Sequence, residues 1–91
     1  MAQVFTVSEK ATFTALGWEV CGNSAYLHMT ALGVGISVDA DGMLRIQETG
    51  ESGTWKWAVA EATASATEAV CQAADWFYAR TGWELLTRRV A

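Results

Sequence analysis

Apolar residues recur at helical spacing near the end of the chain. The residues on this apolar face are Ala66, Ala69, Val70, Ala73, Trp76 and Phe77. A narrow polar stripe lies opposite and consists of Glu68, Gln72, Asp75 and Ala79. This pattern predicts a helix over residues 65–82, whose small alanine face allows close packing on a sheet. Ser65 and Glu68 have the form of a capping box, and Gly82 is a typical C-terminal residue for such a helix.

Alternation of apolar and polar residues is clearest in the middle of the chain. Val34, Ile36 and Val38 form one alternating set, and Leu44 and Ile46 form a second. Between them lies the turn sequence of residues 39–42, so we predict a hairpin with one buried face. A further strand is predicted over residues 54–61. In that strand Trp55, Trp57 and Val59 should share one face, and Thr54, Lys56 and Ala58 the other.

The first third of the chain and its end are less regular. Residues 3–7 are β-formers and predict a short strand. Residues 12–21 fit both a helical and a strand period, but the Gly22-Asn23 pair is a hairpin signal, which favours strands at 12–21 and 25–30. After residue 82, residues 83–90 form either a last strand or a short helical tail, and their alternation favours a strand.

Together these elements predict an α+β fold. It is an antiparallel β-meander of about five to six strands with one long C-terminal helix packed across one face. The 91 residues suffice for one core, so we expect a single domain over residues 1–91.

Composition narrows the functional classes. A net charge of −4 disfavours a general nucleic-acid binder, which needs a basic surface. Cys21 and Cys71 form no CxxC motif, and the first residues lack the pattern of a secretory signal. No apolar run is suited to span a membrane. We therefore expect reduced thiols and a cytoplasmic protein, with Cys71 as a small core residue.

No residue pattern predicts catalysis or a cofactor. Residues 39–42 resemble the start of a calcium loop, but Gly50 occupies the twelfth position, where such a loop needs a glutamate. His28 is the only histidine, and in the predicted hairpin only Cys21 could lie near it. Because no nucleophile, base or metal cluster can be assigned, we expect a protein that is not an enzyme and that binds no cofactor or metal.

The strongest functional signal is aromatic. Five Trp and two Tyr are more aromatic surface than one helix on one sheet readily hides, and interface hot spots are rich in aromatic residues and Arg. Trp55, Lys56 and Trp57 interleave rings with a base, as platforms for single-stranded nucleic acid do, although burial of both rings under the helix is the plainer interpretation. The candidate binding residues are Trp18, Trp55, Lys56, Trp57, Trp83, Arg80, Arg88 and Arg89.

These observations predict a small protein-interaction module whose partner is another protein or protein complex. Compact acidic domains without motifs are a type of chain that phages use to block larger host complexes, which suggests an inhibitor of the anti-CRISPR or anti-restriction kind. The alternative is a domain that contacts nucleic acid through its Trp, Lys and Arg side chains. A homodimer is also expected, formed through residues 83–90 and an outer strand such as residues 18–20.

Overall fold

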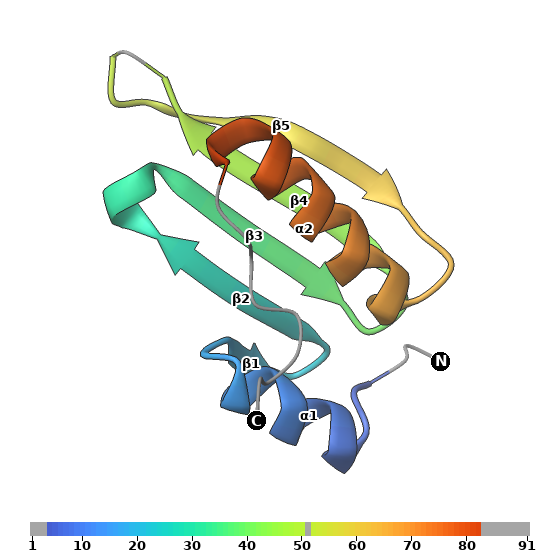
Figure 1. Ribbon diagram of the computed structural model, residues 1–91. Helices are drawn as coiled ribbons and strands as arrows, with labels where there is room; N and C mark the ends of the chain where they lie inside the picture. The colour runs from blue at the N-terminus through green and yellow to red at the C-terminus, as the bar shows by residue number, and fades with distance from the viewer. Residues whose placement is uncertain (1–3, 51, 83–91) are drawn as a thin grey trace.

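The computed structural model describes residues 4–50 and 52–82 of the chain (Figure 1). Its elements, in chain order, are α1 (Val7–Ala15), β1 (Glu19–Cys21), β2 (Ser24–Met29), a 3₁₀ turn (Thr30–Leu32), β3 (Val34–Asp39), β4 (Met43–Thr49), β5 (Trp55–Ala62) and α2 (Ala66–Thr81). The strands form one antiparallel sheet in the order β1-β2-β3-β4-β5, and α2 lies across one face of it (Figure 1). The predicted α+β meander with one C-terminal helix is therefore confirmed.

The C-terminal helix α2 begins and ends as the sequence predicts. The Glu68 backbone N–H donates to the Ser65 hydroxyl at 3.1 Å, and Gly82 caps the other end in the left-handed conformation. The second half of the predicted capping box is different: the Glu68 carboxylate accepts from the N–H of Ala64 at 2.8 Å, one residue before the expected one. The helix is thus tied to the preceding connection as well as to its own first turn.

The N-terminal part of the chain corrects the strand predictions. Residues 4–6 belong to no strand, and most of the stretch 12–21 is not a strand either, because α1 covers Val7–Ala15 and β1 contains only Glu19–Cys21. A capping box starts α1: Glu9 N–H donates to the Thr6 hydroxyl at 3.1 Å, and Thr6 N–H donates to the Glu9 carboxylate at 2.8 Å. This reciprocal pair satisfies two backbone donors at once, which favours the helix over a strand of β-branched residues.

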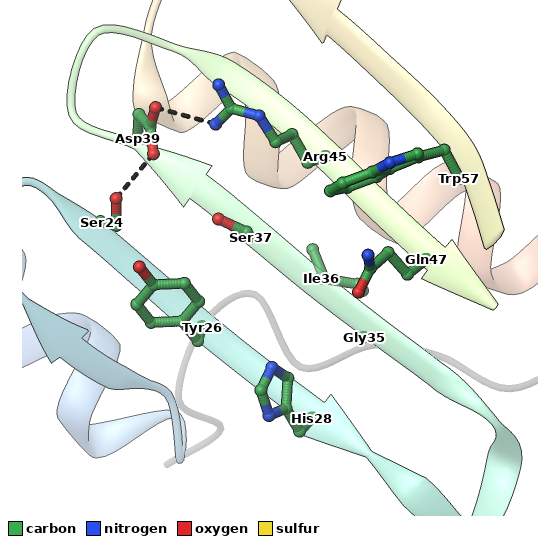
Figure 2. Close-up of a pocket in the computed structure, with 10 residues that line it drawn as sticks. All are labelled: Ser24, Tyr26, His28, Gly35, Ile36, Ser37, Asp39, Arg45, Gln47 and Trp57. Carbon is green, nitrogen blue, oxygen red and sulfur yellow. Dashed lines mark hydrogen bonds and ion pairs between the residues drawn. The ribbon is translucent and has the colours of Figure 1, made fainter. Parts of the chain in front are cut away.

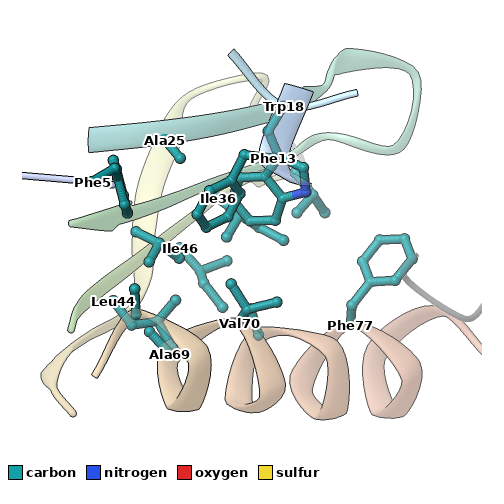
Figure 3. Close-up of a cluster of buried hydrophobic side chains, with 14 residues drawn as sticks. Phe5, Phe13, Trp18, Ala25, Ile36, Leu44, Ile46, Ala69, Val70 and Phe77 are labelled. Carbon is teal, nitrogen blue, oxygen red and sulfur yellow. The ribbon is translucent and has the colours of Figure 1, made fainter. Parts of the chain in front are cut away.

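The main core lies between α2 and the sheet (Figure 3). The sheet contributes alternate residues of two strands, and those of β3 are 2% exposed or less: Val34, Ile36 and Val38. Leu44 and Ile46 of β4 lie beside them, and Ala69 and Ala73 of α2 are fully buried against this face. The alanines carry little side-chain volume, so the helix backbone comes close to the sheet.

An aromatic cluster extends this core toward α1. The ring centroids of Phe5 and Phe13 are 5.1 Å apart, those of Phe13 and Trp18 are 5.2 Å apart, and both pairs meet edge to face. Such pairs add about 0.5–1.5 kcal/mol beyond the burial of their area. Cys71 is not part of the core, contrary to expectation, because its side chain is exposed on α2. None of the helices within residues 4–50 and 52–82 is long and apolar enough to cross a membrane.

Candidate functional site

A β-bulge in β5 decides where its two tryptophans point. Ile46 of β4 pairs with Val59, but the next residue, Gln47, pairs with Trp57, so Ala58 is an extra residue on β5. Side chains alternate between the faces of a strand, and one extra residue reverses the alternation beyond it. Val59 therefore packs on the core side, with Ile46, whereas Trp57 shares the opposite face with Gln47.

The prediction that Trp55, Trp57 and Val59 share one face is consequently wrong, and so is the burial of both indoles under the helix. Trp57 is 60% exposed and Trp55 is 41% exposed, on the sheet face that α2 does not cover. We call this face of the sheet the open face. Its side chains come from alternate positions of the strands, beginning with Tyr26 and His28 on β2 and Arg45 and Gln47 on β4.

Lys56 lies on the other face, away from the two indoles. It pairs with Glu48 of β4, and the Glu48 carboxylate contacts the Arg80 guanidinium of α2 at 2.8 Å. The sequence run Trp55-Lys56-Trp57 thus does not place a positive charge beside the rings. Arg80 is likewise engaged on the helix side rather than on the open face.

A hollow of about 310 Å³ lies over the middle of the open face (Figure 2). Gly35 and Ser37 of β3 form its floor, Tyr26 and His28 stand along one side, and Trp57 reaches over from β5 on the other (Figure 2). The floor is low because Gly35 has no side chain. A Cβ there would lie 3.4 Å from Cδ2 of His28 and 3.8 Å from Cζ3 of Trp55, so both rings approach the backbone of β3.

One end of the hollow is closed by a polar network. The Asp39 carboxylate accepts from the Ser24 hydroxyl at 2.7 Å and from the Arg45 guanidinium at 3.0 Å (Figure 2). The carboxylate and the guanidinium neutralise each other. The hollow is therefore lined by aromatic rings and neutral polar groups, with its charges paired.

Within residues 4–50 and 52–82, the open face brings no nucleophile and base together. Cys21 pairs with Ser24 at the far end of β2, four positions from His28, which is roughly 13 Å along a strand. Among the described residues no group of three His, Cys, Asp or Glu side chains could hold a metal ion. Asp41 accepts from Met43 N–H at 3.2 Å, as a turn residue does, so residues 39–42 form the predicted hairpin turn.

The remaining candidate residues fall elsewhere. Trp18 is 3% exposed, and its indole N–H has no hydrogen-bond partner in the part of the chain that the structure describes. Its packing against Phe13 makes it a core residue, so it presents no surface to a partner. Trp83, Arg88 and Arg89 lie outside the described residues.

Sequence reasoning missed most of the hollow. Tyr26, Arg45 and Gln47 were not among the candidates, and His28 was considered only as a reactive group. The available signal was the strand alternation itself: each of these residues lies next to a residue of the core face, such as Ala25, so each must point the other way. In comparisons with known proteins, the chain matches no family model, no curated protein and no solved structure.

Proposed function

We propose that this chain is a small cytosolic protein-interaction module that performs no catalysis and binds its partner protein on the open face. The observation that carries the proposal is Trp57, whose indole is 60% exposed beside a hollow in a sheet face that α2 leaves uncovered. Exposed tryptophans of this kind are over-represented among the residues that dominate binding energy.

The chemistry of the hollow favours a neutral segment of a protein. Tyr26, Trp57 and the nearby Trp55 supply apolar ring surface, and Gln47 and Ser37 supply donors and acceptors for a peptide backbone. Because Asp39 and Arg45 are paired, no net charge is left to select a strongly charged ligand. An extended stretch of the partner with an apolar side chain matches this lining.

The nucleic-acid alternative has less support. A platform for single strands combines stacked rings with cations that follow the phosphates. Here Lys56 is on the opposite face, Arg45 is bound by Asp39, and the chain carries a net charge of −4.

A role as an inhibitor of a larger host complex remains a prediction, and it requires nothing beyond binding, since a bound module can occupy a surface that the complex needs. The cytosolic placement is supported by the two free, exposed cysteines, which a reducing compartment keeps unpaired.

The test is a comparison of two aromatic variants. Wild-type protein, Trp57→Ala and Tyr78→Ala are immobilised and exposed to a cell lysate, and any retained protein is purified and titrated against each. Tyr78 is 58% exposed on α2, so it controls for the loss of an exposed ring outside the open face. We expect the Kd to rise at least about tenfold for Trp57→Ala, as for a hot-spot residue, and to stay unchanged for Tyr78→Ala.

Equal affinity of Trp57→Ala and wild type for the purified partner would refute the proposal. A parallel titration of the same variants with a fluorescent single-stranded oligonucleotide at low salt tests the nucleic-acid alternative. If wild type binds the oligonucleotide, Trp57→Ala does not, and no protein partner is retained from the lysate, nucleic acid is the favoured ligand instead.

A further inference from the structure

The strand β5 is the last in the sheet order, and no described strand pairs with its outer edge. It is eight residues long, contains no proline, and every residue except Val59 is exposed. Such an edge presents unpaired backbone donors and acceptors, which can pair with another strand. The opposite edge of the sheet is much shorter, because β1 contains three residues.

The sequence of β5 is complementary to itself when it is read backwards. Its eight residues are Trp55-Lys56-Trp57-Ala58-Val59-Ala60-Glu61-Ala62. In an antiparallel pair of two copies centred between Ala58 and Val59, each tryptophan faces an alanine and each lysine faces a glutamate. We propose that two copies of this chain form a symmetric dimer by pairing their β5 strands in this register.

The bulge makes this register consistent on both faces of the sheet. Trp57 and Trp55 lie on the open face, and so does Ala60, which pairs with Arg45. Lys56 and Glu61 lie on the helix face, opposite Glu48 and Leu44 respectively. The register thus places Trp57 against Ala60 of the second copy, with both side chains on the open face. Lys56 likewise faces Glu61 of the second copy on the helix face.

Neighbouring registers lose this match. A shift by one residue would set side chains of opposite faces against each other. A shift by two places Lys56 opposite Val59 in one direction, or Glu61 opposite Ala58 in the other, so the charge pairs disappear in both. Since opposite charges across antiparallel strands attract and like charges repel, the charges select one register.

The side-chain sizes favour the same pairing. Indoles that are 60% and 41% exposed in one copy gain cover from the neighbouring copy, whose alanines leave room for them. Ala58 of both copies lies beside the two-fold axis, so the bulges meet there, and the residues on either side can pair regularly. A two-fold interface uses one patch on both copies and closes at the dimer. The pairing also leaves both open faces on the same side of a continuous sheet.

The experiment uses charge reversal on the helix face, which leaves the hollow untouched. In a dimer of Lys56→Glu, the new glutamate of each copy faces Glu61 of the other copy, which gives two pairs of like charges. In a dimer of Glu61→Lys, the new lysine of each copy faces Lys56 of the other in the same way. By light scattering across a dilution series, wild type should rise from 9.8 kDa toward twice that mass. Each variant should associate at least about tenfold more weakly. Lys10→Glu, which changes an exposed charge on α1, should behave as wild type.

An equimolar mixture of the two variants gives the decisive result. The Lys56→Glu copy then presents two acids to two bases of the Glu61→Lys copy, so a heterodimer should form at concentrations at which each variant alone is mostly monomeric. Circular dichroism establishes that each variant is folded. Should one be unfolded, the double variant Lys56→Glu/Glu61→Lys restores both charge pairs and should dimerise.

Three results would overturn the proposal: wild type at 9.8 kDa at every concentration, single variants that associate as wild type does, or a mixture that stays monomeric. The proposal goes beyond the binding function of the open face. The charge variants at positions 56 and 61 test the dimer by its mass, and the titration of Trp57→Ala tests partner binding, so the failure of one proposal can be told apart from the failure of the other.

Discussion

The turn between β3 and β4 is packed against the connection that leads into α2, and Gly42 lies at the contact. Its backbone has φ +98°, and its carbonyl accepts from the Thr63 N–H at 2.9 Å and from the Thr63 hydroxyl at 2.6 Å. A Cβ at position 42 would lie 2.6 Å from the Thr63 carbonyl oxygen and 2.8 Å from the Ser65 nitrogen. Both are backbone atoms, so neither can turn aside.

We therefore expect Gly42→Ala to destabilise the protein through two separate costs. A left-handed backbone costs a residue with a Cβ about 1–2 kcal/mol. Pushing the turn away from residues 63–65 adds about 1–3 kcal/mol, the usual range for overpacking. The free energy of unfolding should fall by the sum, roughly 2–5 kcal/mol.

Gly53→Ala is the matched control for this variant. Gly53 also has a positive φ, +79°, but a Cβ there would meet no atom within 4 Å. Its cost should be the backbone cost alone, about 1–2 kcal/mol. Urea unfolding followed by tryptophan fluorescence, with an unchanged slope, gives both values. If Gly42→Ala costs no more than Gly53→Ala, the turn is not held against the start of α2 and the reasoning is wrong.

Two further predictions concern the helix start and the thiols. Ser65→Ala should lower the free energy of unfolding by about 1 kcal/mol, because Glu68 N–H loses its acceptor, and Thr67→Ala in the same exposed turn should change it less. Equal values for the two would mean that the cap adds no stability. Cys21 and Cys71 should both react with a thiol reagent in the native protein, since both are exposed. A native thiol count below two per chain would contradict that exposure.

The sequence predicts those parts of the fold in which local and long-range preferences agree. In β3 and β4 the alternation around Val38 and Leu44 matches the core face, and the intervening turn ends in a glycine. In α2 the capping serine, the apolar stripe and Gly82 all indicate the same helix. The strand prediction for residues 3–7 is wrong because it rests on β-propensity alone and leaves out the Thr6–Glu9 capping box, which begins α1. Such propensity depends strongly on context.

The candidate site was less predictable for a physical reason. The run from Trp55 to Ala62 shows no local sign of a break. The extra residue, Ala58, is revealed only by the pairing of β5 with β4, in which the consecutive residues Ile46 and Gln47 pair with Val59 and Trp57. Register is a property of two strands that are distant in the chain. The face on which the tryptophans lie could not be predicted from their own stretch alone.

The order of the strands has a consequence for synthesis of the chain. Each strand pairs with the one made just before it, so the sheet can grow by one hairpin at a time as the chain emerges from the ribosome. The helix α2, which covers the apolar face of Ile36, Leu44 and Ile46, is made after every strand. Until residue 81 has emerged, α2 cannot cover that face, and only the aromatic cluster of Phe5, Phe13 and Trp18 packs at its side. During synthesis the sheet therefore passes through a stage in which it exposes apolar surface, the property that makes folding intermediates prone to aggregation.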